Sequence, residues 1–346
     1  MPQRFLTWSL SGRPRGEGDV MPRVVVFDEF GGPEVLRVTD EAVPEPGPGE
    51  VRVRIEATAV NPLDLMMRAG SSPAPVPLPR ARLGVEASGV VDAVGSGVTS
   101  LEVGQSVLVS AVPNAAAAGT YADYTVLAAQ HVIPRPDGMD AITAAATWVG
   151  FSTAYGALVE KAGMRPGDRV LISAASGSVG RSAIQIANQI GAIPIALTRE
   201  DAKREELVAA GAAAVVVTEG VDLAEGVREV TGGGAEIVLD LVRGPGQQQL
   251  VTAAGPGATL VVAGFLDSRP TPFPVGVGLR IFTYASFEHT LDPVTVARMG
   301  AFLRAGVRLG AIKPVVGEVF ALEDAAEAHR RVESGANGKI ILAPKL

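Results

Sequence analysis

Residues 170–180 read Val170-Leu171-Ile172-Ser173-Ala174-Ala175-Ser176-Gly177-Ser178-Val179-Gly180, and they are the most informative residues of the chain for its fold. It begins as an apolar run typical of a buried strand, passes through a turn of small residues and enters a helix at Arg181–Ala187. Backbone N–H groups and the positive end of the helix dipole meet at this turn, which is an environment that favours a pyrophosphate. Small residues let a phosphate approach the backbone closely. The stretch therefore predicts a dinucleotide-binding turn.

The turn follows the pattern Ala-x-x-Gly-x-x-Gly (Ala174, Gly177, Gly180), with alanine where the common fingerprint has its first glycine. The pattern is weak alone, because a chain with 41 glycines can produce it in a purely structural turn. Its surroundings strengthen it, since predicted strands at Ile193–Thr198, Ala213–Thr218, Ala235–Leu241 and Ala258–Phe265 alternate with predicted helices at Glu200–Ala210, Leu223–Thr231 and Gln247–Ala254. Such alternation indicates an α/β fold with a doubly wound parallel sheet, in which ligands bind beyond the carboxyl ends of the strands.

The end of the second predicted strand favours NADP(H) over NAD(H) as the dinucleotide. An NAD site usually places Asp or Glu there to accept a hydrogen bond from the ribose 2′-hydroxyl. Here Thr198 and Arg199 end the apolar run, with Lys203 one helical turn further on. A guanidinium can bind a 2′-phosphate through two hydrogen bonds, whereas a carboxylate repels it. The alternative is that Arg199 and Lys203 are ordinary solvated charges at the start of a helix.

Composition excludes several classes of protein. The 346 residues are enough for two domains, and the net charge of −7 with scattered basic residues leaves no electrostatic footprint for nucleic acid. The chain has no cysteine, which removes disulfides, thiolate nucleophiles and cysteine-ligated zinc sites. No apolar run approaches the ~20 residues of a membrane span. We expect a cytoplasmic protein, and the use of Ala, Gly, Val and Arg fits a bacterial origin with high GC content.

The residues before the nucleotide-binding region show a different pattern. Gly/Pro turns separate short predicted strands, as in an antiparallel barrel or sandwich; these strands are Val24–Phe27, Val35–Thr39, Val51–Ala59, Ala87–Val94, Ser106–Ser110 and Tyr121–Leu127. After residue 287 we predict helices at Pro293–Ala305 and Glu323–Ser334 and strands at Val315–Phe320 and Gly338–Leu342. This divides the chain into a catalytic domain in two parts (residues 21–143 and 288–346) around a cofactor domain (residues 144–287). Residues 1–20 are expected to be a disordered extension or a mis-assigned start.

Several segments, in this order and spacing, resemble the medium-chain dehydrogenase/reductase superfamily, and the resemblance runs from Met21 to Leu346. They are Val60-Asn61-Pro62-Leu63-Asp64, Gly84-Val85-Glu86-Ala87-Ser88-Gly89-Val90-Val91, Gly150-Phe151-Ser152-Thr153-Ala154-Tyr155-Gly156, the turn Ala174–Gly180, and Gly338-Lys339-Ile340. The resemblance implies a Rossmann sheet inserted in a GroES-like β-barrel catalytic domain, assembled as a homodimer or homotetramer.

Within that superfamily the chain is similar to the zinc-free branch. Zinc alcohol dehydrogenases of similar pattern hold the catalytic metal with Cys, His and Cys, where this chain has Asn61, Val85 and Val149, so we expect no metal. The zinc-free branch includes NADPH:quinone oxidoreductases and enone or enoyl-thioester reductases. The resemblance thus implies hydride transfer from NADPH to an apolar quinone or α,β-unsaturated carbonyl, whose enolate is stabilised by hydrogen-bond donors.

The resemblance also implies roles for individual residues. Asn61 and Thr153 would lie near the nicotinamide, Asn61 as a candidate catalytic group, and Lys339 near the cofactor cleft. The other expected cofactor contacts are Ala174, Ser176, Gly177, Ser178 and Val179 at the pyrophosphate, Thr198, Arg199 and Lys203 at the 2′-phosphate, and Leu241, Val242, Gly264, Phe265 and Leu266 at the ribose and nicotinamide. Equally, Asn61 can be a turn residue before Pro62, and Thr153 can begin or cap a helix.

The proton donor is not evident from the sequence. Quinone oxidoreductases commonly carry a tyrosine two residues beyond the position of Asp64, where this chain has Met66. Tyr121 and Tyr124 are the remaining candidate catalytic donors, although aromatic residues in strands usually serve packing, and water is the other source. Three hypotheses remain: an NADPH-dependent reductase, a non-redox tailoring enzyme such as a cyclase on the same fold, and a nucleotide-binding protein without catalysis.

Overall fold

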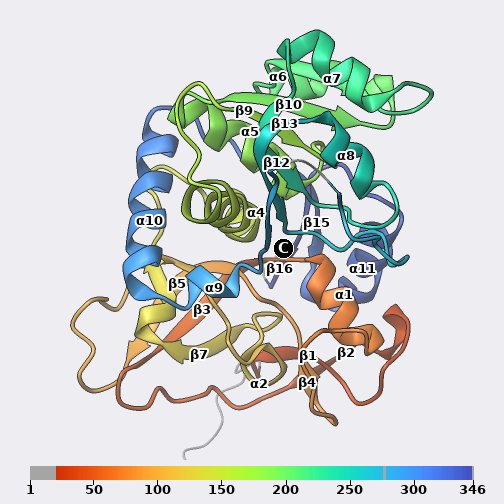
Figure 1. The fold of residues 1–346 in the computed structure, drawn as a ribbon. Helices are drawn as coiled ribbons and strands as arrows, with labels where there is room; N and C mark the ends of the chain where they lie inside the picture. Colours follow the sequence, from red (N-terminus) through yellow and green to blue (C-terminus); the bar gives the residue numbers. More distant parts are fainter. Residues whose placement is uncertain (1–20, 276–277, 345–346) are drawn as a thin grey trace, which may run out of the picture.

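A computed structural model describes residues 21–275 and 278–344, and it folds into two lobes (Figure 1). The upper lobe in Figure 1 contains the predicted nucleotide-binding turn, and the lower lobe contains the β-rich segments from both ends of the chain. The extension predicted at residues 1–20 lies outside the described residues. Within the described ranges, no helix has the length and apolar character needed to cross a membrane.

The upper lobe is built on a six-stranded parallel sheet with the order β11-β10-β9-β12-β13-β14. This is the 3-2-1-4-5-6 order of doubly wound dinucleotide-binding folds. The strands are β9 (Arg169–Ile172), β10 (Ile193–Thr198), β11 (Ala214–Val217), β12 (Ala235–Asp240), β13 (Ala254–Val262) and β14 (Arg280–Thr283). The predicted α/β fold with a parallel sheet is therefore confirmed, and β9 lies at the centre, paired with both β10 and β12.

The helices of this lobe follow the predicted alternation. They are α4 (Trp148–Tyr155), α5 (Ser178–Ile190), α6 (Arg204–Ala209), α7 (Leu223–Thr231) and α8 (Gln247–Ala253). β10 and α7 have the predicted bounds. The predicted helix 200–210 is instead divided into a 3-10 turn at Asp201–Lys203 and α6, and β13 begins at Ala254 rather than Ala258 because Ala254 pairs with Ala235 across a bulge.

The lower lobe contains a seven-stranded, mostly antiparallel sheet with the order β15-β16-β3-β5-β6-β8, in which β7 pairs with β3, and a smaller sheet β2-β1-β4. Its strands are β1 (Arg23–Phe27), β2 (Arg37–Asp40), β3 (Glu50–Ala59), β4 (Ala81–Arg82), β5 (Ala87–Val94), β6 (Ser106–Val109), β7 (Tyr124–Ala128), β8 (Val132–Pro134), β15 (Val316–Ala321) and β16 (Lys339–Ala343). The predicted strand Tyr121–Leu127 begins only at Tyr124. Residues 121–123 bond to β1 instead, for example through Val25 N to Tyr121 O at 2.9 Å, and so form a corner between the two sheets.

The remaining helices connect the lobes or cover the lower one. They are α1 (Pro62–Ala69), α2 (Ala115–Ala118), α3 (Ala141–Ala145), α9 (Phe287–Thr290), α10 (Pro293–Arg308) and α11 (Ala325–Glu333). α10 follows the cofactor sheet in sequence and packs in its core, where Val296, Met299 and Leu303 are buried with α4 and α5. A π-helical turn at Gly156–Lys161 continues α4 toward β9.

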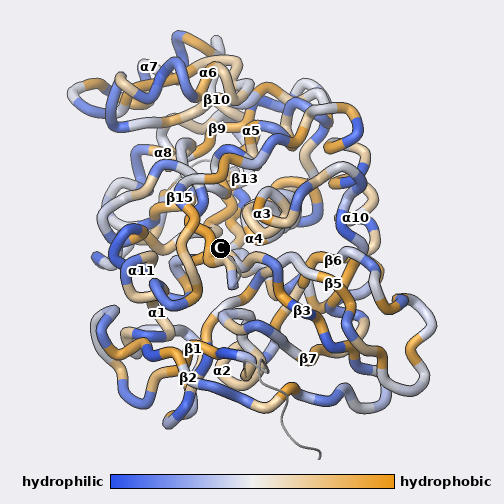
Figure 2. The backbone as a smooth tube through the Cα atoms, turned by 180° about the vertical axis from the view of Figure 1, so that it is seen from behind, coloured by the Kyte–Doolittle hydropathy of each residue, from blue (hydrophilic) through white to orange (hydrophobic). Residues whose placement is uncertain are grey.

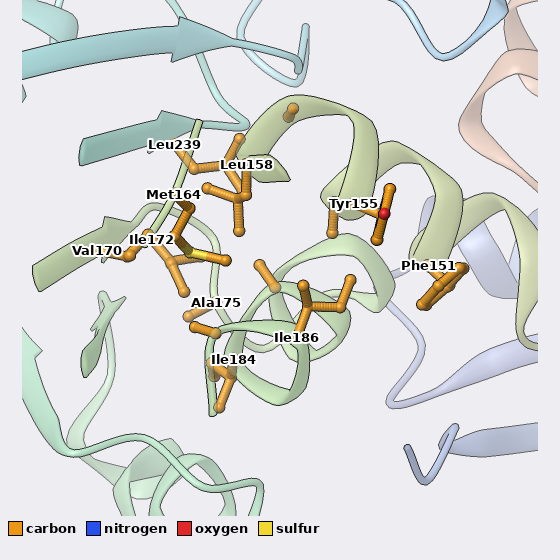
Figure 3. Packing of buried hydrophobic residues seen from close by; sticks show 14 of the residues in the cluster. Phe151, Tyr155, Leu158, Met164, Val170, Ile172, Ala175, Ile184, Ile186 and Leu239 are labelled. Atoms are coloured by element: carbon orange, nitrogen blue, oxygen red, sulfur yellow. The ribbon is translucent and has the colours of Figure 1, made fainter. Parts of the chain in front are cut away.

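The largest core cluster lies under the nucleotide-binding turn. Val170 and Ile172 of β9 pack against Ile184 and Ile186 of α5 and against Leu158, all fully buried (Figure 3). The tube view in Figure 2 shows hydrophobic residues in the strands and hydrophilic residues in the outer loops around α7. This packing fixes the direction in which α5 leaves β9, and therefore the position of the turn.

Candidate functional site

The turn between β9 and α5 has the backbone that its small residues allow. Ala174 has φ of 45°, which is the left-handed region, and Gly177 is the N-cap of α5. A Cβ on Gly180 would lie 2.6 Å from Ala175 Cα and 2.7 Å from Ala174 O, so glycine is required for α5 to approach the turn. A Cβ on Gly177 would meet only Ala174 O at 3.4 Å, which is an ordinary contact. Gly180 therefore serves packing, whereas Gly177 leaves the backbone N–H groups of the helix start accessible to a ligand.

A cavity of about 770 Å³ opens beside this turn at the carboxyl ends of the parallel strands. Loops after β9, β10, β12 and β13 line it. The predicted cofactor residues that the structure brings together there are Ala174, Ser176, Thr198, Arg199, Lys203, Val242 and Leu266. A nucleotide site at this edge of the sheet is what the strand order predicts.

The cations around this cavity differ in whether they form an ion pair. Arg204 pairs with Asp201 at 2.7 Å, and Arg269 pairs with Asp267 at 2.7 Å. The Arg269 guanidinium lowers the pKa of the Asp267 carboxyl to about 2. Arg199 and Lys203 form no ion pair with any residue that the structure describes. Both line the cavity and are free to meet an anion there.

Charged residues on the same cavity that were missed from the sequence include Glu200 and Arg243, besides Asp240, Asp267 and Arg269. Glu200 directly follows Arg199, and its N–H donates to Thr198 Oγ1 at 3.3 Å. Arg243 stands three residues beyond β12 and has φ of 69°, a conformation that costs a non-glycine residue about 1–2 kcal/mol. The signal in the sequence was its position, because the loop after β12 meets the loop after β10 at one edge of the sheet.

Asp240 holds the backbone of the loop that carries Arg243. Its buried carboxylate accepts hydrogen bonds from Val242 N at 2.9 Å, Arg243 N at 3.0 Å and Gln247 Nε2 at 2.8 Å. Leu241, in the same loop, contacts Gly264, where a Cβ would lie 1.8 Å from Leu241 O. The two loops after β12 and β13 are thus pressed together, and the left-handed conformation of Arg243 is fixed by its surroundings.

Arg181 joins the turn to two other parts of the molecule. Its Nε donates to Ser176 O at 2.8 Å, and its Nη2 donates to Asn337 Oδ1 at 3.0 Å. It also pairs with Glu206 of α6, and only 8% of the residue is exposed. The phosphate turn is therefore tied both to α6 and to the loop that leads into β16 of the other lobe.

Asn61 and Lys339 meet in a buried polar group of the lower lobe. Lys339 Nζ lies 2.8 Å from Glu86 Oε1 and also donates to Asn61 Oδ1. Asn61 Nδ2 donates to Glu86 Oε1 at 3.0 Å, and Val149 N of α4 donates to Glu86 Oε2 at 2.6 Å. Glu86 is completely buried and was missed as a site residue, although it lies in a segment that carries the family resemblance. It connects β16, the start of α1 and the start of α4.

Asn61 has a structural role as well. It caps α1, and its N–H donates to Asp64 Oδ2 at 2.8 Å, which closes a capping box. Asp64 also accepts from Gly84 N at 2.8 Å and is completely buried. Burial raises the pKa of the Asp64 carboxyl to about 6, against the lowering effect of these two backbone hydrogen bonds.

The two tyrosines lie away from the cavity beside the turn. Tyr121 is fully buried, and its hydroxyl lies 3.3 Å from Nε2 of His329, whose Nδ1 accepts from Arg68 at 3.1 Å. Burial raises the pKa of Tyr121 well above its usual value and lowers the pKa of His329 to about 3. Tyr124 is only partly exposed, and its ring lies under the Arg52 guanidinium at 5.9 Å. Both rings therefore have packing partners within the lower lobe.

Thr153, Ser178, Val179 and Phe265 do not line the cavity, whereas Leu266 does. Thr153 lies inside α4 and is 9% exposed, so it is not a capping residue. Ser178 and Val179 form the first turn of α5. Phe265 and Leu266 follow β13 and are 43% and 62% exposed. In the described part of the chain, no group of three His, Cys, Asp or Glu residues is arranged to hold a metal ion.

Comparisons with known proteins agree with this geometry. Residues 47–137 match the family model described as alcohol dehydrogenase GroES-like domain, and residues 178–291 match the model described as zinc-binding dehydrogenase. Human quinone oxidoreductase is 30% identical over 334 residues, which cover 94% of this chain and 98% of the relative. A phenolphthiocerol/phthiocerol polyketide synthase from Mycobacterium tuberculosis is 32% identical over 271 residues, covering 75% of this chain and 12% of that larger protein.

Solved structures show the same likeness across both lobes. The quinone oxidoreductase of Pseudomonas syringae superposes with a TM-score of 0.85 at 28% identity, covering 94% of this chain and 100% of that one. The Escherichia coli quinone oxidoreductase in complex with NADPH superposes with a TM-score of 0.83 at 26% identity, covering 93% and 100% of the two chains. Together with the sheet order and the turn, these comparisons show that the chain belongs to the medium-chain dehydrogenase/reductase superfamily of oxidoreductases, in its quinone oxidoreductase branch.

Proposed function

We propose that this chain is an NADPH-dependent reductase of quinones or α,β-unsaturated carbonyls that works without zinc. The observation that carries the proposal is the pair of cations, Arg199 and Lys203, which line the cavity beside the phosphate turn without an ion-pair partner among the described residues. A pair of cations that form no ion pair among the described residues, beside a turn for pyrophosphate, fits a dinucleotide with an additional phosphate on the ribose.

The residues present fit this cofactor. The backbone at Ser176–Val179 would hold the pyrophosphate, because Gly177 has no side chain to obstruct it and α5 directs its N-terminus there. Arg199, Lys203 and Thr198 would surround the 2′-phosphate, and Val242 and Leu266 would provide apolar contacts. When bound, a reduced nicotinamide supplies a hydride to the electron-poor carbon of a conjugated acceptor.

Zinc is not needed for such an acceptor. The three positions that match the zinc ligands of related alcohol dehydrogenases are Asn61, Val85 and Val149, and Asn61 is engaged by Glu86 and Lys339. None of these side chains offers the thiolate or imidazole that zinc prefers. Because a conjugated carbonyl or quinone accepts a hydride at carbon, its oxygen needs only hydrogen-bond donors as its charge develops.

We propose that water delivers the proton. Tyr121 is buried against His329, and Tyr124 lies against Arg52, so neither hydroxyl is placed on the described cavity. Asn61 is bound on both amide atoms, which suits a positioning role for the surrounding loop better than proton transfer. The similarity to quinone oxidoreductases supports a quinone acceptor, and the similarity to a polyketide synthase segment supports an enoyl acceptor.

The first experiment is a titration of the purified protein with NADPH and, separately, with NADH, followed by nicotinamide fluorescence. We expect NADPH to bind at least tenfold more tightly than NADH, and we expect Arg199→Glu to remove this difference. Arg228→Glu is the matched control, because Arg228 lies in the last turn of α7 and does not line the cavity. Consumption of NADPH with a benzoquinone or a cyclic enone then tests the reaction.

Two other outcomes would favour a different function. Failure of both dinucleotides to bind would overturn the reductase proposal in favour of a non-redox tailoring enzyme, such as a cyclase. Binding of NADPH without its consumption by any quinone or enone would favour a nucleotide-binding protein without catalysis.

We also propose that two copies of the chain associate along β14, the edge strand of the cofactor sheet. Ile281 on this strand is 37% exposed, and Phe287 just beyond it is 40% exposed. Unpaired backbone groups on an edge strand next to apolar side chains favour pairing with a second copy. A monomeric mass by light scattering at micromolar concentration would reject this assembly.

A further inference from the structure

We propose that Arg243 is a third cation for the 2′-phosphate of NADPH and helps to determine the preference for NADPH over NADH. The inference rests on the proposed function. It adds a residue from a different loop, the one after β12, to Arg199 and Lys203 from the loop after β10. The three cations would then hold the phosphate from two sides of the cavity.

The backbone of Arg243 is the first observation that supports this role. Its φ of 69° lies in the region that glycine occupies without strain and that other residues avoid. Asp240 fixes this conformation by accepting hydrogen bonds from the N–H groups of Val242 and Arg243 at 2.9 and 3.0 Å. Gly244 follows with φ of 74°, so the turn already uses glycine where a side chain is not needed. A strained arginine at such a position indicates that its side chain has a function.

The positions of the other residues with positive φ also support a ligand site at this cavity. Besides Arg80, the described residues with positive φ that are not glycine are Ala174 and Arg243, and both of these line the cavity. Ala174 is in the phosphate turn after β9, and Arg243 is in the loop after β12, the strand next to β9. Backbone strain in the cofactor lobe is therefore concentrated around one cavity, as is common at ligand sites.

Charge is the second observation. Of the charged groups that line the cavity, Arg269 and Asp267 neutralise each other at 2.7 Å, and the Asp240 carboxylate is saturated by hydrogen bonds from its own loop and Gln247. This leaves three cations, Arg199, Lys203 and Arg243, with no ion pair for any of them in the described residues, beside the two carboxylates of Glu200 and Asp240.

The lining thus has one more cation than carboxylates, which suits an anionic ligand. A phosphate monoester carries about −1.5 to −2 charges near pH 7, whereas NADH has only a 2′-hydroxyl at that position. Without Arg243, the charges of Arg199 and Lys203 would be matched by those of Glu200 and Asp240. The third cation therefore gives the cavity the net positive charge that favours a 2′-phosphate.

The test is a single substitution that separates binding from stability. Arg243→Gly removes the cation. Glycine also adopts the left-handed backbone conformation without strain, so the midpoint of thermal unfolding should stay the same or rise. We expect NADPH to bind about ten- to a hundredfold more weakly, which corresponds to the loss of a hydrogen bond between charged groups. NADH should bind within about twofold of the wild type. Adenosine 2′,5′-bisphosphate and 5′-AMP, compared by calorimetry, should repeat this difference without the nicotinamide.

Arg80→Gly is the matched control, because Arg80 is an exposed arginine with φ of 59° that does not line the cavity. It removes the same charge and relieves the same kind of backbone, and it should leave the preference for NADPH unchanged. Arg243→Lys should retain part of the preference, since the charge remains while the two-pronged geometry is lost.

Two results would overturn the inference while leaving the proposed function intact. One is an Arg243→Gly protein that binds NADPH as tightly as the wild type. The other is an equal loss for NADPH and NADH, which would place the guanidinium on a part that the two dinucleotides share. If the wild-type protein binds neither dinucleotide, the proposed function itself fails, and this is seen before any variant is made.

Discussion

Lys339→Met tests whether the buried group around Glu86 holds the lower lobe together. The Lys339 ammonium and the Glu86 carboxylate are 6% and 0% exposed and lie 2.8 Å apart. Removing the ammonium leaves the carboxylate buried with only Asn61 Nδ2 and Val149 N as donors. Breaking a buried ion pair on one side costs about 3–5 kcal/mol, because an uncompensated charge remains. We expect a loss of unfolding free energy in this range.

The double variant Lys339→Met/Glu86→Gln supplies the comparison. With both charges removed, the unfolding free energy should recover to within about 2 kcal/mol of the wild type, since neutral replacements of buried pairs are often tolerated. The assay is urea unfolding at pH 7, followed by the fluorescence of Trp148, which is 1% exposed. At about 2.1 cal/mol/K per residue over the 346 residues, 3–5 kcal/mol corresponds to a fall of roughly 4–7 °C in Tm. A single variant within about 1 kcal/mol of the wild type, or a double variant no better than the single one, would refute this reasoning.

Three further substitutions test the turn and the buried acid. Gly180→Ala should lower the unfolding free energy by about 1–3 kcal/mol, because its Cβ would lie 2.6 Å from Ala175 Cα. Gly177→Ala should change the unfolding free energy by less than about 0.5 kcal/mol and should weaken NADPH binding instead. Equal Tm values for the two variants would contradict this expectation. The folded protein keeps a proton on Asp64 up to a pKa of about 6, while the unfolded chain releases it near 3.8, so this carboxyl favours folding below pH 4 and loses that contribution as the pH rises to 6. Relative to Asp64→Asn, the wild type should therefore lose about 2 kcal/mol between pH 4 and pH 7, measured by urea unfolding, and parallel pH profiles would show that the carboxyl does not titrate there.

Local patterns were enough to predict the cofactor lobe. The alternation of apolar strands with helices after residue 170 predicted the parallel sheet, and β10 and α7 begin and end at the predicted residues. Both elements have clear limits in the sequence, since Thr198 is followed by charged residues and Gly232 ends α7 in a left-handed conformation. By contrast, β13 starts four residues early, because pairing with β12 extends it through Ala-Gly-Pro-Gly, a sequence that predicts a turn.

The residues that were missed depend on contacts between distant segments. Glu86 becomes part of the site only when β16 brings Lys339 beside α1, and these residues are far apart in the chain. For Arg243 the sequence offers only its position after β12, because a sequence does not reveal that a particular arginine has positive φ. Thr198 ends β10, and Arg199 and Lys203 come shortly after it; all three line the cavity, and their contact with a 2′-phosphate stays a prediction.

The contacts of Arg181 matter for chimaeras in which one lobe is exchanged between members of the family. It binds Ser176 O in the turn, Glu206 in α6 and Asn337 in the loop before β16, and Asn337 Nδ2 also donates to Glu206 Oε2 at 3.3 Å. A chimaera that takes the cofactor lobe from another family member would replace the first two partners but keep the third. Arg181, Glu206 and Asn337 should therefore be transplanted as one unit, even though the last of them lies outside the segment that a domain swap would normally include.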